Sequence, residues 1–154
     1  AQKILRGLKD SYDYVVVDAP PAFTEVILRA FDLADNYLLL TTLDTPSLKN
    51  LKVTLGTLQA LGMPRSKWNV VINRSTAKSG ISVADVQKAI GIEIVAQIPS
   101  SDVVPISTNQ GKTVLEANAK HAVSHAIRGL AGSLYGVPAA TAPRRGLFGF
   151  MARA

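Results

Sequence analysis

Apolar residues recur along the chain in two patterns, one with the spacing of an α-helix and one in short continuous runs typical of buried strands. Ile4, Leu5 and Leu8 have the helical spacing, so residues 1–9 are predicted to form a short amphipathic helix. The next apolar run, residues 14–17, is mostly β-branched and is ended by two prolines. A strand that is apolar on both faces is typical of the middle of a parallel sheet, and this run is predicted to be one.

Helical and strand patterns continue to alternate as far as residue 134. A Ser82 and Asp85 pair is typical of a helix start and Gly91 of a helix stop. Predicted helices cover residues 24–34, 45–61, 82–90 and 121–134, predicted strands cover residues 37–42, 68–72 and 92–97, and a loop is expected from Pro99 to about Val114. The last strand alternates apolar and polar residues, so it is expected near the sheet edge. This order predicts the α/β class with a mostly parallel sheet.

The composition changes after Tyr135. Residues 136–143 are small and proline-rich, which predicts a flexible linker. Residues 144–154 form a tail that mixes basic and bulky apolar side chains, and its candidate membrane contacts are Arg144, Arg145, Leu147, Phe148, Phe150 and Met151. A basic tail without a lipid role stays an alternative, because two glycines in this segment disfavour a helix. The predicted organisation is therefore one domain over 1–135, then the linker and the tail.

Composition narrows the candidate chemistry. The 154 residues include no cysteine, which excludes thiolate metal sites, iron–sulfur clusters and cysteine nucleophiles from this chain. His121 and His125 are the only histidines and have no third ligand at suitable spacing, so no direct metal site is expected and both are predicted to be solvated. The net charge of +6 favours acidic partners such as nucleotides, DNA or anionic lipid.

Distinctive polar residues follow three of the four predicted strands. Asp18 follows the first, Asn73 and Arg74 follow the third, and residues 99–102 follow the fourth. Ligands of open parallel sheets bind beyond the carboxyl ends of the strands, which makes these residues candidates for one site. An acidic residue after a buried strand needs a cation or hydrogen-bond donors, so Asp18 is predicted either to face Mg²⁺ with a nucleotide phosphate or to cap the following turn.

The order of these segments resembles the MinD/ParA class of P-loop ATPases. YDYVVVDAPP is similar to the Walker B and switch II segment, VVINR to the strand that ends at the adenine, and IPSSDVVPISTNQGKTV to the loop over base and ribose. Within that class, residues 18–55 most resemble the CpaE/TadZ-type pilus-assembly ATPases. The resemblance implies a three-layer P-loop NTPase-type sheet, with ATP and Mg²⁺ as cofactors in the complete protein.

The resemblance also implies a role for each matching residue. Asp18 would hold Mg²⁺ through water, and Ala19, Pro20 and Pro21 would belong to switch II. Asn73 would hydrogen-bond the adenine and Arg74 would pack over the base, which suits an amide and a guanidinium. The residues expected to line the base and ribose are Pro99, Ser100, Ser101 and Asp102.

One part of the family pattern is absent from these residues. The glycine-rich phosphate loop has no counterpart, since Gly111-Lys112-Thr113 lacks a glycine five positions earlier and no buried strand precedes it directly. The chain begins with Ala1, so we expect it to be the C-terminal part of a longer ATPase whose sheet is incomplete at its N-terminal side. These residues alone are expected to bind nucleotide weakly and to hydrolyse it negligibly.

The implied function is that of an ATP-binding, ATP-hydrolysing dimeric switch that positions pilus-assembly, secretion, septum or partition machinery. Two alternatives stay open: a non-hydrolysing TadZ-like localisation factor, and a tyrosine autokinase of the exopolysaccharide type. Implied partners are a second copy of the chain, cell-pole machinery and an anionic membrane surface, with a cytoplasmic or peripheral membrane location. Non-specific DNA also stays open, although the basic residues are scattered along the sequence, at Arg65, Lys67, Arg74, Lys78 and Arg128.

Overall fold

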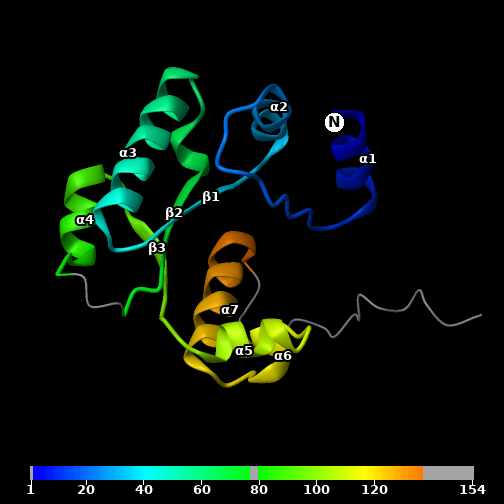
Figure 1. The fold of residues 1–154 in the computed structure, drawn as a ribbon. Helices are drawn as coiled ribbons and strands as arrows, with labels where there is room; N and C mark the ends of the chain where they lie inside the picture. Colours follow the sequence, from blue (N-terminus) through cyan, green and yellow to red (C-terminus); the bar gives the residue numbers. More distant parts are fainter. Residues whose placement is uncertain (1, 77–79, 137–154) are drawn as a thin grey trace, which may run out of the picture.

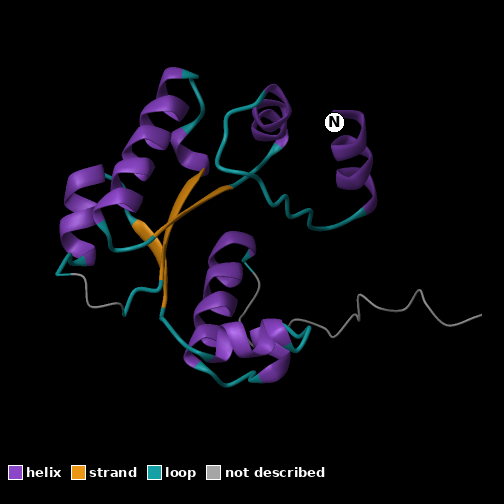
Figure 2. Ribbon diagram, in the orientation of Figure 1, coloured by secondary structure: helices purple, strands orange, loops and turns teal. Residues whose placement is uncertain are grey.

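The computed structural model describes residues 2–76 and 80–136, which form a parallel sheet between two layers of helices (Figure 1, Figure 2). The strands are β1 (Tyr37–Thr41), β2 (Trp68–Asn73) and β3 (Ile94–Ile98), in the order β1-β2-β3. Both pairings are parallel, and β1 and β2 run in continuous register from Tyr37 opposite Trp68. The predicted α/β class is confirmed, and β3 lies at a sheet edge, as its alternating pattern predicts.

The described helices are α1 (Gln2–Ser11), α2 (Glu25–Leu33), α3 (Thr45–Ala60), the 3₁₀ turn η1 (Arg65–Lys67), α4 (Val83–Ile90), α5 (Val103–Asn109), α6 (Val114–Ala117) and α7 (Ala122–Tyr135). All five predicted helices are present, as α1, α2, α3, α4 and α7, and the structure adds three short helical segments. The Ser82 hydroxyl caps α4 by accepting the Asp85 N–H at 3.1 Å, and Gly91 ends it with a φ of 64°. Both sequence signals for this helix are therefore confirmed.

The main core lies between the sheet and the layer formed by α3 and α4 (Figure 2). Leu51, Leu55 and Leu58 recur at helical spacing on α3 and pack against Tyr37, Trp68 and Val70 of the sheet. A second cluster joins Val86 of α4 to Leu43 and Ile72. Burying one such side chain contributes about 1.5–3 kcal/mol, so these two clusters stabilise the packing of α3 and α4 on the sheet.

The opposite face of the sheet is covered in part by α7, which packs against β3 (Figure 1). Val123 and Ser124 are the buried residues of this helix. The Ser124 hydroxyl lies 2.7 Å from the Asn118 carbonyl oxygen and 3.1 Å from that of Val114, which ties α7 to the end of α6. On the same face near β1, Leu40 is 61% exposed. The cover is therefore uneven: α7 packs against β3 but leaves it partly exposed, and Leu40 of β1 is more exposed still.

The predicted buried strand at residues 14–17 is wrong for the structure as described. Residues 14–20 are extended but belong to no strand, and Val16 is 83% exposed and Val17 49% exposed. A parallel strand needs hydrogen-bonding neighbours and helical cover on both faces, and none of the three strands in the described residues pairs with this segment. Residues 14–17 therefore have the composition of a central strand but no neighbouring strand in the described residues with which to pair.

The predicted loop from Pro99 to about Val114 is also wrong in part, because it contains α5; the unpredicted α6 begins where the loop was expected to end. Pro105 lies in the first turn of α5, where a missing N–H costs no helical hydrogen bond. Thr113 and Glu116 form a capping box that starts α6, with the Thr113 N–H donating to the Glu116 carboxylate at 2.9 Å. Helices this short leave too few residues for a periodic pattern to appear in the sequence.

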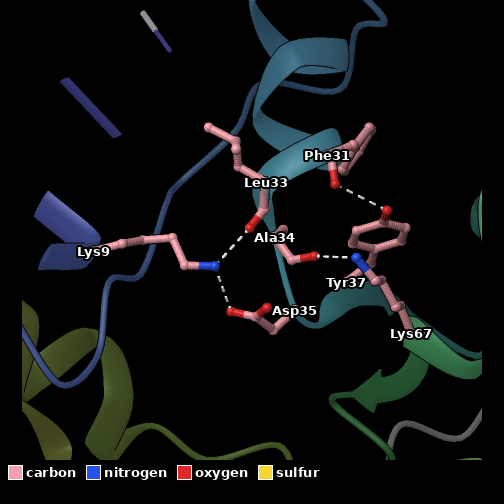
Figure 3. Close-up of polar contacts among 7 residues, drawn as sticks. All are labelled: Lys9, Phe31, Leu33, Ala34, Asp35, Tyr37 and Lys67. Atoms are coloured by element: carbon pink, nitrogen blue, oxygen red, sulfur yellow. Dashed lines mark hydrogen bonds and ion pairs between the residues drawn. The ribbon is translucent and has the colours of Figure 1, made fainter. Parts of the chain in front are cut away.

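Side chains from three parts of the chain satisfy the carbonyl groups at the end of α2 (Figure 3). Lys9 Nζ donates to the Leu33 carbonyl at 2.8 Å, and Lys67 Nζ donates to the Ala34 carbonyl at 2.7 Å. The Tyr37 hydroxyl donates to the Phe31 carbonyl at 3.0 Å. Lys9 Nζ also lies 2.8 Å from the Asp35 carboxylate. Ammonium groups are favourable at a helix C-terminus, so these contacts hold α1 and the sheet against α2.

Candidate functional site

The candidate site lies at the carboxyl ends of β2 and β3. Asn73 is the last residue of β2, and its Oδ1 accepts the Arg74 N–H at 3.0 Å. Arg74 has a φ of 53°, and among the described residues other than glycine it is the only one with a positive φ. A left-handed conformation is costly for arginine, and such strained residues are enriched at functional sites. The chain therefore turns sharply at the point where the sequence places the adenine-binding pair.

Two hydrogen bonds join the residues after this turn to the last residue of β3 and to the segment that follows it. The Ser75 N–H donates to the Ile98 carbonyl at 2.9 Å, and the Ser100 N–H donates to Thr76 Oγ1 at 3.0 Å. The structure thus brings residues 73–74 and residues 99–101 to the same end of the sheet. Their roles in nucleotide binding stay predictions.

The chemistry of this group suits a purine. Asn73 is half-buried and offers an amide, which pairs with adenine through one acceptor and one donor. Arg74 is exposed beside it, and a guanidinium stacks well on a flat ring. Asp102 lies directly before α5 with an exposed carboxylate, so it adds an acceptor at the rim.

Asp18 stands apart from these residues in the chain. It lies in the exposed extended segment between α1 and α2, and the strand end predicted for it is not formed in the described residues. The neighbouring candidates Ala19, Pro20 and Pro21 are exposed as well, and the Ala22 N–H donates to the Pro20 carbonyl at 2.7 Å in a tight turn. The proposed Mg²⁺ and switch II roles of this segment stay predictions.

A polar cluster at the end of β1 is a feature that sequence reasoning missed. Asp44 caps α3 by accepting the Ser47 N–H at 2.9 Å, and the Thr42 hydroxyl donates to the same carboxylate. The Thr42 hydroxyl also lies 2.7 Å from Ser47 Oγ. Hydrogen bonds from Thr42 and Ser47 hold the pKa of Asp44 below its usual value. The signal was present as an aspartate three residues before a serine at a helix start.

His121 is a second feature that the sequence did not predict. It was expected to be solvated, but it is half-buried, caps α7 and lies 3.2 Å from the Ser101 hydroxyl through Nε2. His125 is exposed one turn later, as expected. The described residues contain no cluster of three metal-ligating side chains.

The Gly111-Lys112-Thr113 sequence is a turn between two helices. Gly111 has a φ of 68° after α5, and Thr113 starts the four-residue α6. A phosphate loop connects a strand directly to a helix, so this geometry agrees with its rejection on sequence grounds.

Two hollows among the described residues lie away from the candidate site. A hollow of about 160 Å³ lies among α1, α2 and residues 12–17, and another of about 180 Å³ lies between α3 and α4. Neither is lined by Asn73, Arg74 or residues 99–102.

Three of the scattered basic residues interact within the protein. Arg65 lies over the Trp68 ring at 5.5 Å, Lys67 binds the end of α2, and Arg128 donates to the Ala119 carbonyl. Lys78, the linker after Gly136 and the tail lie outside the described residues. Across residues 2–76 and 80–136, no helix has both the length and the hydrophobicity needed to cross a bilayer.

Comparison with known proteins finds similarity to MinD proteins and to a ParA family ATPase. No protein-family model matches the chain. The septum site-determining protein MinD of Thermotoga maritima is 28% identical over 113 residues, which are 70% of this chain and 42% of that protein. A putative MinD of Guillardia theta is 30% identical over 117 residues, which are 72% of this chain and 43% of that protein. The chain thus spans about two-fifths of the length of these relatives.

Solved structures give the same result. A ParA family ATPase from Chlorobium tepidum has a TM-score of 0.77 at 21% identity, over 88% of this chain and 55% of that one. The MinC:MinD complex of Aquifex aeolicus has a TM-score of 0.75 at 25% identity, over 89% of this chain and 58% of that one. MinD of Pyrococcus horikoshii, complexed with Mg-ADP, has a TM-score of 0.73 at 18% identity, over 87% of this chain and 55% of that one. The fold is therefore that of MinD/ParA-type P-loop ATPases, and the sequence similarity to MinD proteins supports placing the chain in that family.

Proposed function

We propose that the chain forms the base-and-ribose side of an ATP site in a dimeric, nucleotide-dependent switch of the MinD/ParA type. The observation that supports this most is the connection between the Arg74 turn and the loop after β3, made by the Ser75–Ile98 and Ser100–Thr76 hydrogen bonds. Two segments from different parts of the chain thereby meet where α/β proteins bind ligands. The structure of the P. horikoshii MinD with Mg-ADP makes ATP and Mg²⁺ the natural cofactors to propose.

The donors and acceptors at this edge fit an adenine nucleoside. Asn73 Oδ1 retains a second lone pair after accepting the Arg74 N–H, and its amide nitrogen can donate to a ring nitrogen. The left-handed turn places the Arg74 side chain directly after Asn73, where a guanidinium can cover the base. Ser100, Ser101 and Asp102 offer hydroxyl and carboxylate groups suited to the ribose.

The phosphates and Mg²⁺ would require residues outside these 154. We propose that a further strand, followed by its phosphate loop, pairs with the free edge of β1, which is an outer strand of the described sheet, and with residues 14–17. Such a strand would give Val16 and Val17 a neighbour and would place Asp18 at a strand end, where it would hold Mg²⁺ through water. Bound Mg²⁺ would neutralise phosphate charge during transfer to water. The chain alone is expected to turn over ATP negligibly.

The process served by the switch is proposed from the named relatives. MinD proteins of T. maritima and G. theta are septum site-determining proteins by name, which favours septum-site positioning. The pilus-assembly alternative depends only on the motif resemblance of residues 18–55, and the non-hydrolysing TadZ-like alternative depends on the phosphate loop. None of the relatives reported above favours a tyrosine autokinase. The A. aeolicus complex makes a MinC-like protein a candidate partner beside a second copy of the chain.

The tail is proposed to bind an anionic membrane surface weakly. Four bulky apolar residues and three arginines lie within residues 144–154, a combination that gives weak, reversible interfacial binding. Sedimentation with vesicles containing anionic lipid should recover the intact protein and not a variant that ends at residue 142. Equal recovery of both would contradict the anchor.

Adenine recognition is tested by the Asn73→Asp variant. The carboxylate keeps the acceptor for the Arg74 N–H but removes the amide donor, so the turn is preserved while the pairing with adenine is lost. In the full-length protein, including any residues that precede Ala1, we expect ATP affinity by calorimetry to fall about tenfold or more, because a bidentate base contact contributes about 1–3 kcal/mol.

The matched control is Asn50→Asp, which introduces the same charge at an exposed position of α3. It should leave ATP affinity unchanged. The proposal would be contradicted if the Asn73→Asp protein bound ATP like the unmodified protein, or if the full-length protein bound no adenine nucleotide.

A further inference from the structure

His121 links the N-terminus of α7 to the loop that carries the candidate ribose-binding residues. Its Nδ1 lies 3.2 Å from the Val123 nitrogen, and its Nε2 lies 3.2 Å from the Ser101 hydroxyl oxygen. Both His121 and Ser101 are half-buried. One imidazole therefore contacts two segments that are 20 residues apart in the sequence.

The position of the ring proton follows from these contacts. A backbone N–H can only donate, so Nδ1 accepts from Val123 and the proton of the neutral ring lies on Nε2. Nε2–H then donates to Ser101 Oγ. The Val103 N–H donates to the same oxygen at 3.2 Å. Both lone pairs of the Ser101 oxygen are thus engaged, and its hydrogen is left to donate to another group.

We propose that His121 is a positioning residue that makes Ser101 an obligate hydrogen-bond donor to an acceptor atom of the bound nucleoside. This inference rests on the proposed function, because it concerns the same site. A serine hydroxyl normally rotates and both donates and accepts. Because its oxygen already accepts from His121 and Val103, the Ser101 hydroxyl can only donate to a ligand. This favours a ligand that places a ribose oxygen or a ring nitrogen beside Ser101.

The choice of residue at the start of α7 supports this role. Other helices with a capping side chain in the described part of the chain use Thr24, Asp44, Ser82 and Thr113, which are ordinary capping residues. Histidine is not among the preferred caps, but its second nitrogen reaches Ser101, which a serine or aspartate at position 121 would be too short to do. The neighbouring Ser100 is held from the other side by Thr76. The loop is therefore fixed at both flanks.

The test compares His121→Asn with Ser101→Ala in the full-length protein. Asparagine is a good helix cap, so His121→Asn keeps α7 while removing the contact with Ser101. Each variant should lower ATP affinity about fivefold, the effect of one neutral hydrogen bond, and the double variant should be no weaker than Ser101→Ala alone. Ser101→Thr, which keeps a hydroxyl, should bind nearly as the unmodified protein does. His125→Asn is the matched control and should have no effect.

Nitrogen NMR of the imidazole gives a readout without nucleotide. The neutral His121 ring should carry its proton on Nε2, and a proton on Nδ1 would overturn the inference. Additive losses in the double variant, or full ATP affinity in His121→Asn with a thermal unfolding curve like that of the unmodified protein, would also overturn it. In those cases the Asn73→Asp effect would persist and the proposed function would stand. Absence of ATP binding by the unmodified full-length protein would overturn both.

Discussion

Arg74 has a left-handed backbone, and replacing it with glycine should make the protein more stable while weakening nucleotide binding. Its φ of 53° is unfavourable for any residue with a Cβ, at a cost of about 1–2 kcal/mol. Glycine removes this cost, but its greater freedom in the unfolded chain takes back about 0.5–1 kcal/mol. The backbone N–H that donates to Asn73 Oδ1 is kept in the variant. The expected net gain is about 0.5–1 kcal/mol.

The matched variant is Arg74→Ala, which also removes the guanidinium but keeps the Cβ. Arg74→Gly should therefore be more stable than Arg74→Ala by about 0.5–1 kcal/mol, measured as the difference in free energy of unfolding in urea. Thermal unfolding should show the same order, with a difference of about 1–4 °C for a domain of this size. Both variants should lose ATP affinity equally, because both lack the group proposed to cover the base.

The two measurements refute different parts of the reasoning. If Arg74→Ala were as stable as Arg74→Gly, the left-handed turn would not be strained. If both variants bound ATP like the unmodified protein, the guanidinium would not contact the nucleotide, and the candidate site would lose one of its two base-recognition groups.

Three further predictions concern the fold and its pH dependence. Leu58 is fully buried between α3 and the sheet, so Leu58→Ala should cost about 2–5 kcal/mol in urea unfolding, whereas Leu61→Ala, at a side chain that is 45% exposed, should cost far less; equal losses would contradict the assigned core. Burial and, to a smaller degree, the charge of Asp32 raise the pKa of Tyr37 above 10.0, so the stability that protonated Tyr37 contributes is complete below pH 10 and is lost as the pH rises through the folded-state pKa. Tyr37→Phe should therefore reduce the loss of thermal stability at alkaline pH. An unchanged pH profile in this variant would contradict the raised pKa. The hydrogen bond from Thr42 and then those from Ser47 lower the pKa of Asp44 below 3.8, so the stability that ionised Asp44 contributes is present above pH 3.8 and is lost as the pH falls through the folded-state pKa. Asp44→Ala should lower the unfolding temperature at pH 7 and weaken this acid dependence, whereas Asp44→Ser should retain most of the helix cap. Equal unfolding temperatures for the two variants would contradict the assigned cap.

Local signals in the sequence were sufficient for the three strands and for five helices, α1, α2, α3, α4 and α7. Ser82 with Asp85 and Gly91 marked the limits of α4 because capping and left-handed turns depend on a few adjacent residues. The leucines of α3 predicted its buried face for the same reason, since their spacing repeats with the helical turn. Helices α5 and α6 were missed because seven and four residues do not establish a period.

The sequence by itself determined the α/β order, the apolar character of each strand and the residue types at the strand ends. The tertiary structure decided which of these segments became neighbours. Residues 14–17 have the composition of a central strand, but Tyr14, Val16 and Val17 are exposed and the segment forms no strand, because a strand forms only with a paired neighbour and pairing is a non-local property. The contact between His121 and Ser101 is also non-local, because the chain between them folds back through α5 and α6. Local sequence patterns could therefore not predict it.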